Sequence, residues 1–183
     1  MKRFLIFALT LTIAAAVLLA QGKRNQNNPL SPARDTSLTI NGKTISISYS
    51  APSMRGRTIF GPNGIVAKDP TAPVWRAGAD NATSIHTDAD LMIGSLSVPK
   101  GDYTLFVLPE PGKWQLIVNK QTGQWGTEYN QSQDLARIPM KVSQRSAGLE
   151  MFTISFDKTS GNSATLKLEW ENTIASVDVK EAK

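Results

Sequence analysis

The 183-residue sequence predicts an all-β fold, an antiparallel β-sandwich that is jelly-roll-like or of a related topology. Three observations favour it. Apolar and polar residues alternate in short runs, turn residues separate the runs roughly every 8–12 residues, and no run has the spacing of an amphipathic helix. A chain of this length supports one domain with a substantial core. We expect that domain to span residues 35–183.

The first 20 residues predict a secretory signal peptide. Met1-Lys-Arg gives a charged start, and an apolar run extends from Phe4 to Ala20. A retained membrane anchor is the alternative, because the run is near the lower length limit for crossing a bilayer. Residues 21–34 are polar and asparagine-rich, so we expect a flexible lead-in. The expected location is extracytoplasmic, either periplasmic or secreted, with membrane contact only through an uncleaved signal.

The first strand pair has the clearest pattern. Leu38 and Ile40 alternate with polar residues, Asn41-Gly42 interrupts them, and the alternation resumes from Ile45 to Tyr49. Asn-Gly supplies the two positive-φ residues of a type I′ turn, so the pattern predicts a β-hairpin.

The remaining elements follow in order along the chain. Strands are predicted at residues 91–98, 103–108, 114–119, 151–157, 164–170 and 173–179, with a strand-like stretch at 83–88 and a short helical turn at 132–136. Both faces of 103–108 and 114–119 are apolar, which places these two strands in the centre of the sandwich. One of their faces needs a cover, and we expect the long proline-rich loop at residues 51–73 to provide it.

The composition excludes several classes of function. The chain has no cysteine and one histidine, His86, which excludes disulfides, thiolate metal sites, cysteine nucleophiles and multi-histidine metal centres. The net charge is +5, and loss of Lys2 and Arg3 with the signal would lower it by two. The other cations are scattered rather than gathered in a stripe, so we expect no nucleic-acid partner. We predict no cofactor and no metal.

Two loop segments carry side chains that no strand or helix pattern requires, and loops on a rigid scaffold often carry function. The first, residues 52–61, contains Arg55-Gly-Arg57. The two guanidinium groups could hold a carboxylate or a phosphate. In the structural alternative, each arginine ties the long loop down through backbone carbonyls and a nearby aspartate.

The second segment is residues 74–83. Trp75 beside Arg76 could stack on a sugar, and Asp80 with Asn81 could accept hydrogen bonds from hydroxyl groups. Too few oxygen ligands are near for a calcium loop. In the structural alternative, Asp80-Asn81 caps a turn through side-chain to backbone bonds and Arg76 pairs with Asp80.

Trp125 lies in a third loop, residues 119–126, between two glycines. It could serve as a sugar platform or fold back over the core. The predicted ligand-binding surface therefore consists of Arg55, Arg57, Trp75, Arg76, Asp80, Asn81 and Trp125.

Catalytic chemistry has weaker support. His86 lies two residues before Asp88, and such a pair could act as a general base, but no Gly-x-Ser-x-Gly nucleophile elbow accompanies it. Asp80, Glu128 and Asp134 could supply the carboxyl pair of a glycoside hydrolase, which needs a defined separation that a sequence does not fix. We assign no catalytic residue, and the sequence favours a non-enzymatic protein.

The same segments resemble a known family. The motifs that carry the resemblance are Tyr49-Ser-x-Pro52, Arg55-Gly-Arg-x-Ile-Phe-Gly61, Val74-Trp-Arg-x-Gly-Ala-Asp-x-Ala-Thr83, Pro99-x-Gly-x-Tyr-x-Leu-Phe106, Trp114 to Lys120 and Gln124-Trp-Gly126. Over roughly residues 31–143 the chain is similar to the bacterial family called domain of unknown function 2911. The resemblance implies an exported, predominantly β domain. It implies no reaction and no catalytic residues, because the family has none assigned. Asp80 departs from the pattern, in which asparagine is expected.

Three functions remain open. The first is a non-enzymatic extracytoplasmic binding module for glycans or small anionic groups. The second is a structural or envelope interaction protein whose arginine-rich loops only lock the fold. The third is a hydrolase that uses Asp80, Glu128 or Asp134 with His86. Convergence of the predicted side chains in one open concavity would support a binding site, and internal pairing would support a lock. The sequence leaves the ligand and the oligomeric state open.

Overall fold

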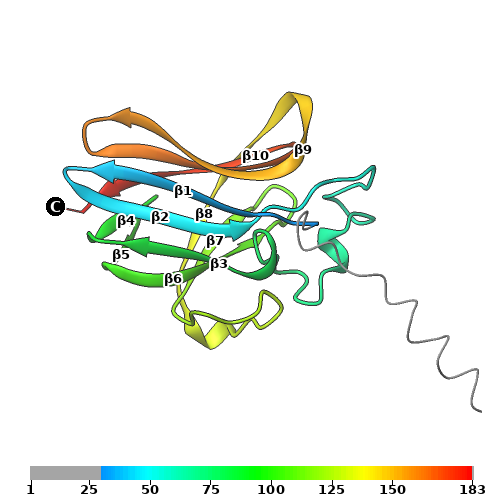
Figure 1. Cartoon of the computed structure of the whole chain (residues 1–183), viewed down its shortest axis with the longest axis horizontal. Helices are drawn as coiled ribbons and strands as arrows, with labels where there is room; N and C mark the ends of the chain where they lie inside the picture. The colour runs from blue at the N-terminus through cyan, green and yellow to red at the C-terminus, as the bar shows by residue number, and fades with distance from the viewer. Residues whose placement is uncertain (1–29, 183) are drawn as a thin grey trace, which may run out of the picture.

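The structure is a computed structural model that describes residues 30–182. Two antiparallel sheets pack face to face, as the alternating pattern predicts (Figure 1). The larger sheet has the strand order β1-β2-β3-β6-β7-β8, and the smaller has β5-β4-β10-β9. The predicted signal peptide, residues 1–20, and most of the predicted lead-in lie outside the described residues. Within residues 30–182, no helix is long and apolar enough to cross a membrane.

The larger sheet contains β1 (Ala33–Ile40), β2 (Lys43–Ser50), β3 (Ala79–Thr87), β6 (Gly101–Leu108), β7 (Gln115–Asn119) and β8 (Asp134–Pro139). The smaller sheet contains β4 (Leu91–Ile93), β5 (Leu96–Val98), β9 (Lys141–Ser160) and β10 (Ser163–Glu181). Short 3-10 helices, η2 (Val66–Lys68) and η3 (Gln131–Gln133), lie in the connections.

The first two strands form the predicted hairpin. Asn41 and Gly42 have φ values of 49° and 77°, both in the left-handed region that a type I′ turn requires. The pairing extends from Ile40 opposite Lys43 to Ala33 opposite Ser50. β1 therefore begins inside the segment that the sequence predicts as lead-in.

The smaller sheet differs from the prediction because β9 and β10 are long. β10 has no break between residues 170 and 173. Glu171 instead has a φ of 53°, and the pairing with β9 shifts on both sides of it, so a bulge bends β10 where the sequence predicts two strands. The first half of β9, residues 141–150, is mostly exposed on both faces. It therefore lacks the alternation that predicts a strand.

Two shorter segments also differ. The strand predicted at residues 91–98 is a tight hairpin of β4 and β5, which turns at Gly94 with a φ of 57°. The helical turn predicted at 132–136 is divided between η3 and β8. The side chain of Asn130 accepts a hydrogen bond from the Ser132 backbone N–H and caps η3, and the strand begins at Asp134.

The main core lies between the two sheets. Each strand of the centre contributes fully buried aliphatic side chains, such as Leu105, Leu116 and Leu166, and burial of each contributes about 1.5–3 kcal/mol. At one end of the sandwich, five aromatic rings pack with centroids 4.9 to 6.3 Å apart. These rings, here called the aromatic cluster, are those of Phe60, Trp75, Trp114, Phe152 and Trp170.

β6 and β7 are buried on both faces, as their sequences predict. A second apolar cluster covers their outer side and consists of Val74, Phe106, Leu108 and Ile117. The ring of Tyr129 packs on Phe106 with centroids 4.9 Å apart. Among the described residues, this cluster contains none from the loop at 51–73 that the sequence predicts as the cover. The cover comes instead from Val74, just after that loop, and from the segment that carries Tyr129. The loop itself closes one end of the sandwich (Figure 1), where Ile59 enters the main core.

Candidate functional site

The loop between β2 and β3, residues 51–78, bounds a pocket of about 280 Å³. Five of the seven residues predicted for ligand binding line this pocket, which we call the arginine pocket. They are Arg55, Arg57, Trp75, Arg76 and Asp80. Two segments separated by 12 residues, 52–61 and 74–83, therefore bring their predicted side chains to one concavity.

Arg55 and Arg57 are held by a tight turn. Arg55 and Gly56 have φ values of 51° and 70°, and the Arg57 N–H donates to the Met54 carbonyl at 3.0 Å. The Arg57 side chain donates to the carbonyls of Met54 (2.9 Å) and Ser53 (2.7 Å). The Arg55 side chain donates to the carbonyl of Leu30 at 2.5 Å. Both guanidinium groups are thus anchored to backbone, as the structural alternative predicts.

Arg76 is anchored by a carboxylate. Its Nε and Nη2 donate to the same oxygen of Asp69 at 3.1 and 2.9 Å, and the two side chains are only 13% and 12% exposed. Asp69 in turn accepts hydrogen bonds from the backbone N–H and the hydroxyl of Thr71. The predicted pairing of Arg76 with Asp80 is wrong. The turn at residues 69–71 brings Asp69 closer, and sequence spacing does not reveal that turn.

The two tryptophans predicted for ligand binding, Trp75 and Trp125, differ in exposure. Trp75 is 2% exposed, and its ring stacks on Trp170 with centroids 5.9 Å apart. It therefore belongs to the core and lines the pocket without offering an open face to a sugar. Trp125 is 46% exposed, so it does not fold back over the core.

Asn81 and Trp125 adjoin the pocket through Asp80. Asn81 forms an isolated β-bridge with Trp125, and the N–H of Gly126 donates to the Asp80 carbonyl at 2.9 Å. The contact is close, because a Cβ at Gly126 would lie 2.6 Å from the Cδ of Arg76. The loop that carries Trp125 thus packs against the arginine pocket.

Several residues with strained backbone conformations lie at this pocket. Three of the non-glycine residues with positive φ lie in it or next to it, namely Arg55 (51°), Ala77 (50°) and Asp80 (58°). Such conformations cost roughly 1–3 kcal/mol each and tend to cluster at functional sites. The hydroxyl of Thr83 donates to the Ala77 carbonyl at 2.8 Å and helps to hold this turn. The geometry therefore adds a second reason to place a function here.

A larger cavity of about 780 Å³ lies on another side of the same loop. We call it the apolar groove, and its walls include two rings of the aromatic cluster and four prolines: Phe60, Trp114, Pro62, Pro73, Pro109 and Pro111. Val66 lines both cavities. Sequence reasoning missed the groove, because prolines at residues 109–111 indicate only a turn.

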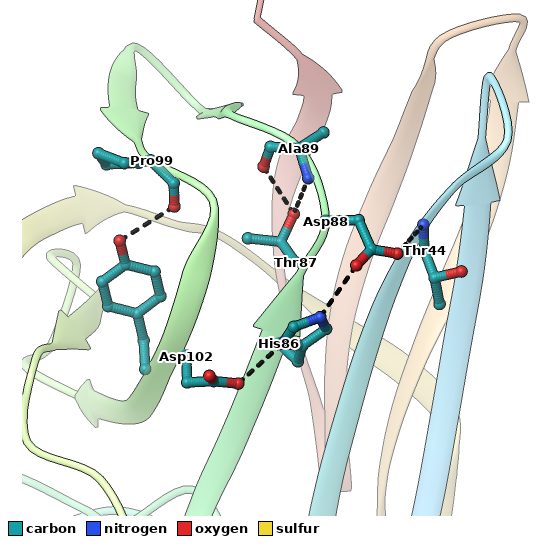
Figure 2. A network of polar contacts seen from close by, with 8 residues as sticks. Thr44, His86, Thr87, Asp88, Ala89, Pro99 and Asp102 are labelled. Carbon is teal, nitrogen blue, oxygen red and sulfur yellow. Dashed lines mark hydrogen bonds and ion pairs between the residues drawn. The ribbon is translucent and has the colours of Figure 1, made fainter.

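His86 lies at the other end of β3, within a network of exposed polar groups (Figure 2). Its Nδ1 is 2.7 Å from a carboxylate oxygen of Asp102, and its Nε2 is 3.1 Å from one of Asp88. The second oxygen of Asp88 accepts from the Thr44 N–H at 3.1 Å. Asp102 and then Asp88 raise the pKa of His86. Because both ring nitrogens are engaged by carboxylates, this histidine is not positioned as a general base.

The carboxyl groups considered for hydrolysis have separate surroundings. Asp134 accepts hydrogen bonds from Asn119 (2.9 Å), Tyr129 (2.7 Å) and Arg137 (2.8 Å), and burial, together with Asp134, raises the pKa of Tyr129 to about 12. Neither Asp134 nor Glu128 lines the pocket that holds Asp80. Among residues 30–182, no group of three or more histidine or carboxylate side chains could hold a metal ion.

The fold and the pocket define an antiparallel β-sandwich whose β2–β3 loop closes one end and holds three anchored arginines. A family model described as Protein of unknown function (DUF2911) matches residues 31–179, and the chain belongs to this family. The match extends well beyond the range of roughly 31–143 over which the motifs resemble the family, and it includes most of β10. No curated protein and no solved structure matches the chain.

Proposed function

We propose that this protein is an exported, non-enzymatic binding module for a small anionic ligand, which it binds in the arginine pocket. One observation carries the proposal: three guanidinium groups share one pocket, and each is already held in place by bonds to backbone or to Asp69. Anchored side chains lose little rotamer freedom when a ligand binds, so their hydrogen bonds contribute more to affinity.

The arginines keep donors for a ligand. A guanidinium group has five N–H donors, and the described contacts of Arg57 use its Nε and one Nη2 donor. Its planar fork matches a carboxylate or a phosphate. Among the described residues, the pocket lining carries three arginines against two aspartates, Asp69 and Asp80. This balance favours an anion over a cation.

The pocket also limits the size of the ligand. Its volume of about 280 Å³ lies just below the range of about 300–1,000 Å³ for pockets of drug-sized ligands. The ring of Trp75 is buried and has no face on which a sugar could stack. Of the predicted glycan ligands, we therefore propose an acidic sugar whose carboxylate enters the pocket. Trp125, exposed beside Asn81, is the side chain available for contact with the sugar ring.

Export is part of the proposal and rests on the predicted signal peptide at residues 1–20. The mass of the protein recovered from the periplasm or medium tests it. A chain that stays in the cytoplasm with residues 1–20 attached would contradict export without affecting the pocket.

The second candidate function is that of a structural or interaction protein whose arginine-rich loop only locks the fold. It is favoured by the bonds of Arg57 to the carbonyls of Ser53 and Met54, which tie the loop to itself. In this case the arginines only stabilise the loop, and the protein acts through another surface.

Titration of the purified protein with phosphate, citrate, glucuronate and uncharged glucose separates the two. We expect at least one anion to bind saturably, glucose not to bind, and Arg55→Gln to lower the affinity about tenfold, which is the effect of losing one charge-assisted contact. Lys100→Gln, an exposed lysine outside the pocket, is the matched control. If no anion binds and Arg55→Gln and Arg57→Gln change only the melting temperature, the binding proposal is wrong and the lock remains.

A further inference from the structure

We propose that the apolar groove is a second binding site, for a single-chain amphiphile with an apolar body and an anionic end. The site is separate from the arginine pocket, so the inference does not depend on the function proposed above.

The groove has the size and walls of a ligand cavity. Its volume of about 780 Å³ falls within the range of about 300–1,000 Å³ that holds small organic ligands. Phe60 and Trp114 form part of one wall, and their rings pack on each other with centroids 4.9 Å apart. The prolines of the wall have fixed backbone φ angles, so these positions lose less backbone freedom when a ligand binds.

The lining is suited to an uncharged body. Within residues 30–182, no charged side chain lines the groove, and its polar side chains are those of Gln144 and Thr173. These two residues are direct partners in the pairing of β9 with β10, so they lie together on one wall. A charged group buried against the remaining walls would lose its hydration without compensation. The buried part of the ligand is therefore apolar.

The groove is open and leaves apolar surface in contact with water. Val142 is 43% exposed, and Ala67, Ala72 and Pro73 are also exposed. Contiguous exposed apolar surface on a single domain commonly marks a binding site.

The charges beside the groove favour an anionic end. Lys68 follows Ala67 in the chain, Lys113 precedes Trp114, and both lysines are exposed. Glu110 lies between two lining prolines and is exposed as well, and the half-buried Glu171 has a carboxylate oxygen 3.5 Å from the backbone N of Phe60. Among the exposed neighbours of the lining in the described chain, two unpaired lysines therefore stand against one carboxylate. Lys141 precedes Val142, but its Nζ lies 3.8 Å from a carboxylate oxygen of Asp178, so its charge is already paired.

The experiment uses laurate as the probe, at concentrations where it is monomeric. We expect saturable binding with one site per protein, measured by calorimetry and by tryptophan fluorescence, and much weaker binding of butyrate, which lacks the apolar body. Uncharged dodecanol should bind more weakly than laurate by about threefold to tenfold, because it lacks the charge that the lysines attract.

Two sets of variants test separately the walls that contact the apolar body of the ligand and the lysines that attract its anionic end. Val142→Glu, at an exposed position, should lower laurate affinity at least tenfold, and Ala72→Glu provides the same test if the first variant folds poorly. Lys68→Glu with Lys113→Glu should remove the preference for laurate over dodecanol. Lys100→Glu and Arg55→Gln should leave laurate binding unchanged, which separates this site from the arginine pocket.

Absence of saturable laurate binding, or equal affinity in Val142→Glu and Ala72→Glu, would overturn the proposal. A concentration-dependent dimer that Val142→Glu abolishes, without laurate binding, would assign the groove to a second copy of the chain and would overturn it as well. Loss of laurate binding in Arg55→Gln would contradict the separation of the two cavities.

Discussion

The arginine pocket and the apolar groove both border the β2–β3 loop and share Val66, but the side chains that line them are held in different ways. Side chains of the pocket are fixed by hydrogen bonds, as in the pair of Arg76 with Asp69. Those of the groove are fixed by packing, as in the contact of Phe60 with Trp114. One irregular loop therefore presents a charged surface and an apolar surface at once. A strand can do the same only by alternation.

The aromatic cluster links the two cavities. Phe60 lines the groove, Trp75 lines the pocket, and their rings are in contact at 5.7 Å. Substitutions should therefore separate into those that damage the shared cluster and those that change one cavity only.

The largest effect is expected for Trp75→Ala. It removes a buried ring from the shared cluster and should lower the free energy of unfolding by about 3–5 kcal/mol, with loss of binding in both cavities. Trp125→Ala, at an exposed position, should change it by less than about 0.5 kcal/mol. Urea unfolding followed by circular dichroism measures both. Equal effects of the two variants would contradict the placement of Trp75 in the core.

Gly126→Ala should affect the pocket alone. The new Cβ would lie 2.6 Å from the Cδ of Arg76 and 2.7 Å from the Asp80 carbonyl, so the backbone must move, at a cost of about 1–3 kcal/mol. Anion binding should weaken, and laurate binding should not change. Gly161→Ala, where a Cβ has open space, is the control for thermal unfolding. An equal loss of stability in both variants would argue against the close contact at Gly126.

Asp80→Asn should raise anion affinity by about twofold to fivefold, the effect of removing one exposed like charge. Its backbone has a φ of 58°, a conformation that asparagine also tolerates, so the free energy of unfolding should change by less than about 0.5 kcal/mol. Calorimetry with the anion that binds the natural protein is the measurement, and laurate binding is the internal control. Unchanged or weaker anion binding would show that Asp80 does not face the ligand.

The smallest effect is expected at His86, which is remote from both cavities and well exposed. Its pKa is raised above the ordinary 6.5 by Asp102 and Asp88, so its contribution to stability is complete below pH 6.5 and is lost as pH rises through the raised pKa. The pKa of Asp88 is lowered below 3.8, mainly by His86, so its contribution is lost as pH falls through that lowered pKa.

The network therefore stabilises the fold most between about pH 3.8 and 6.5. Titration of the His86 ring by NMR should give a pKa above 6.5, and Asp102→Asn should lower it toward that value. A ring that titrates below 6.5 would contradict the network. Asp102→Asn should not alter binding in the pocket or the groove.

The same contrast explains what the sequence can predict. Local chemistry reveals the hairpin at Asn41-Gly42, and apolar residues on both faces reveal that β6 and β7 are central. The loop residues of the arginine pocket are recognisable because no strand pattern requires them there. The partner of Arg76 is not predictable, because it depends on a turn at residues 69–71. The groove is missed for the same reason, since its walls come from residues that are far apart in the chain and individually ordinary.

The hydrogen bond from Arg55 to the carbonyl of Leu30 has a practical consequence. Leu30 also lines the arginine pocket, whereas the C-terminal end, where Ala182 bonds to Asp90, lies at the opposite end of the sandwich (Figure 1). A bulky label joined close to Leu30 would sit beside the pocket and obstruct it. Attachment to a sensor surface through the C-terminus leaves the pocket facing the solution, and this orientation suits ligand screening.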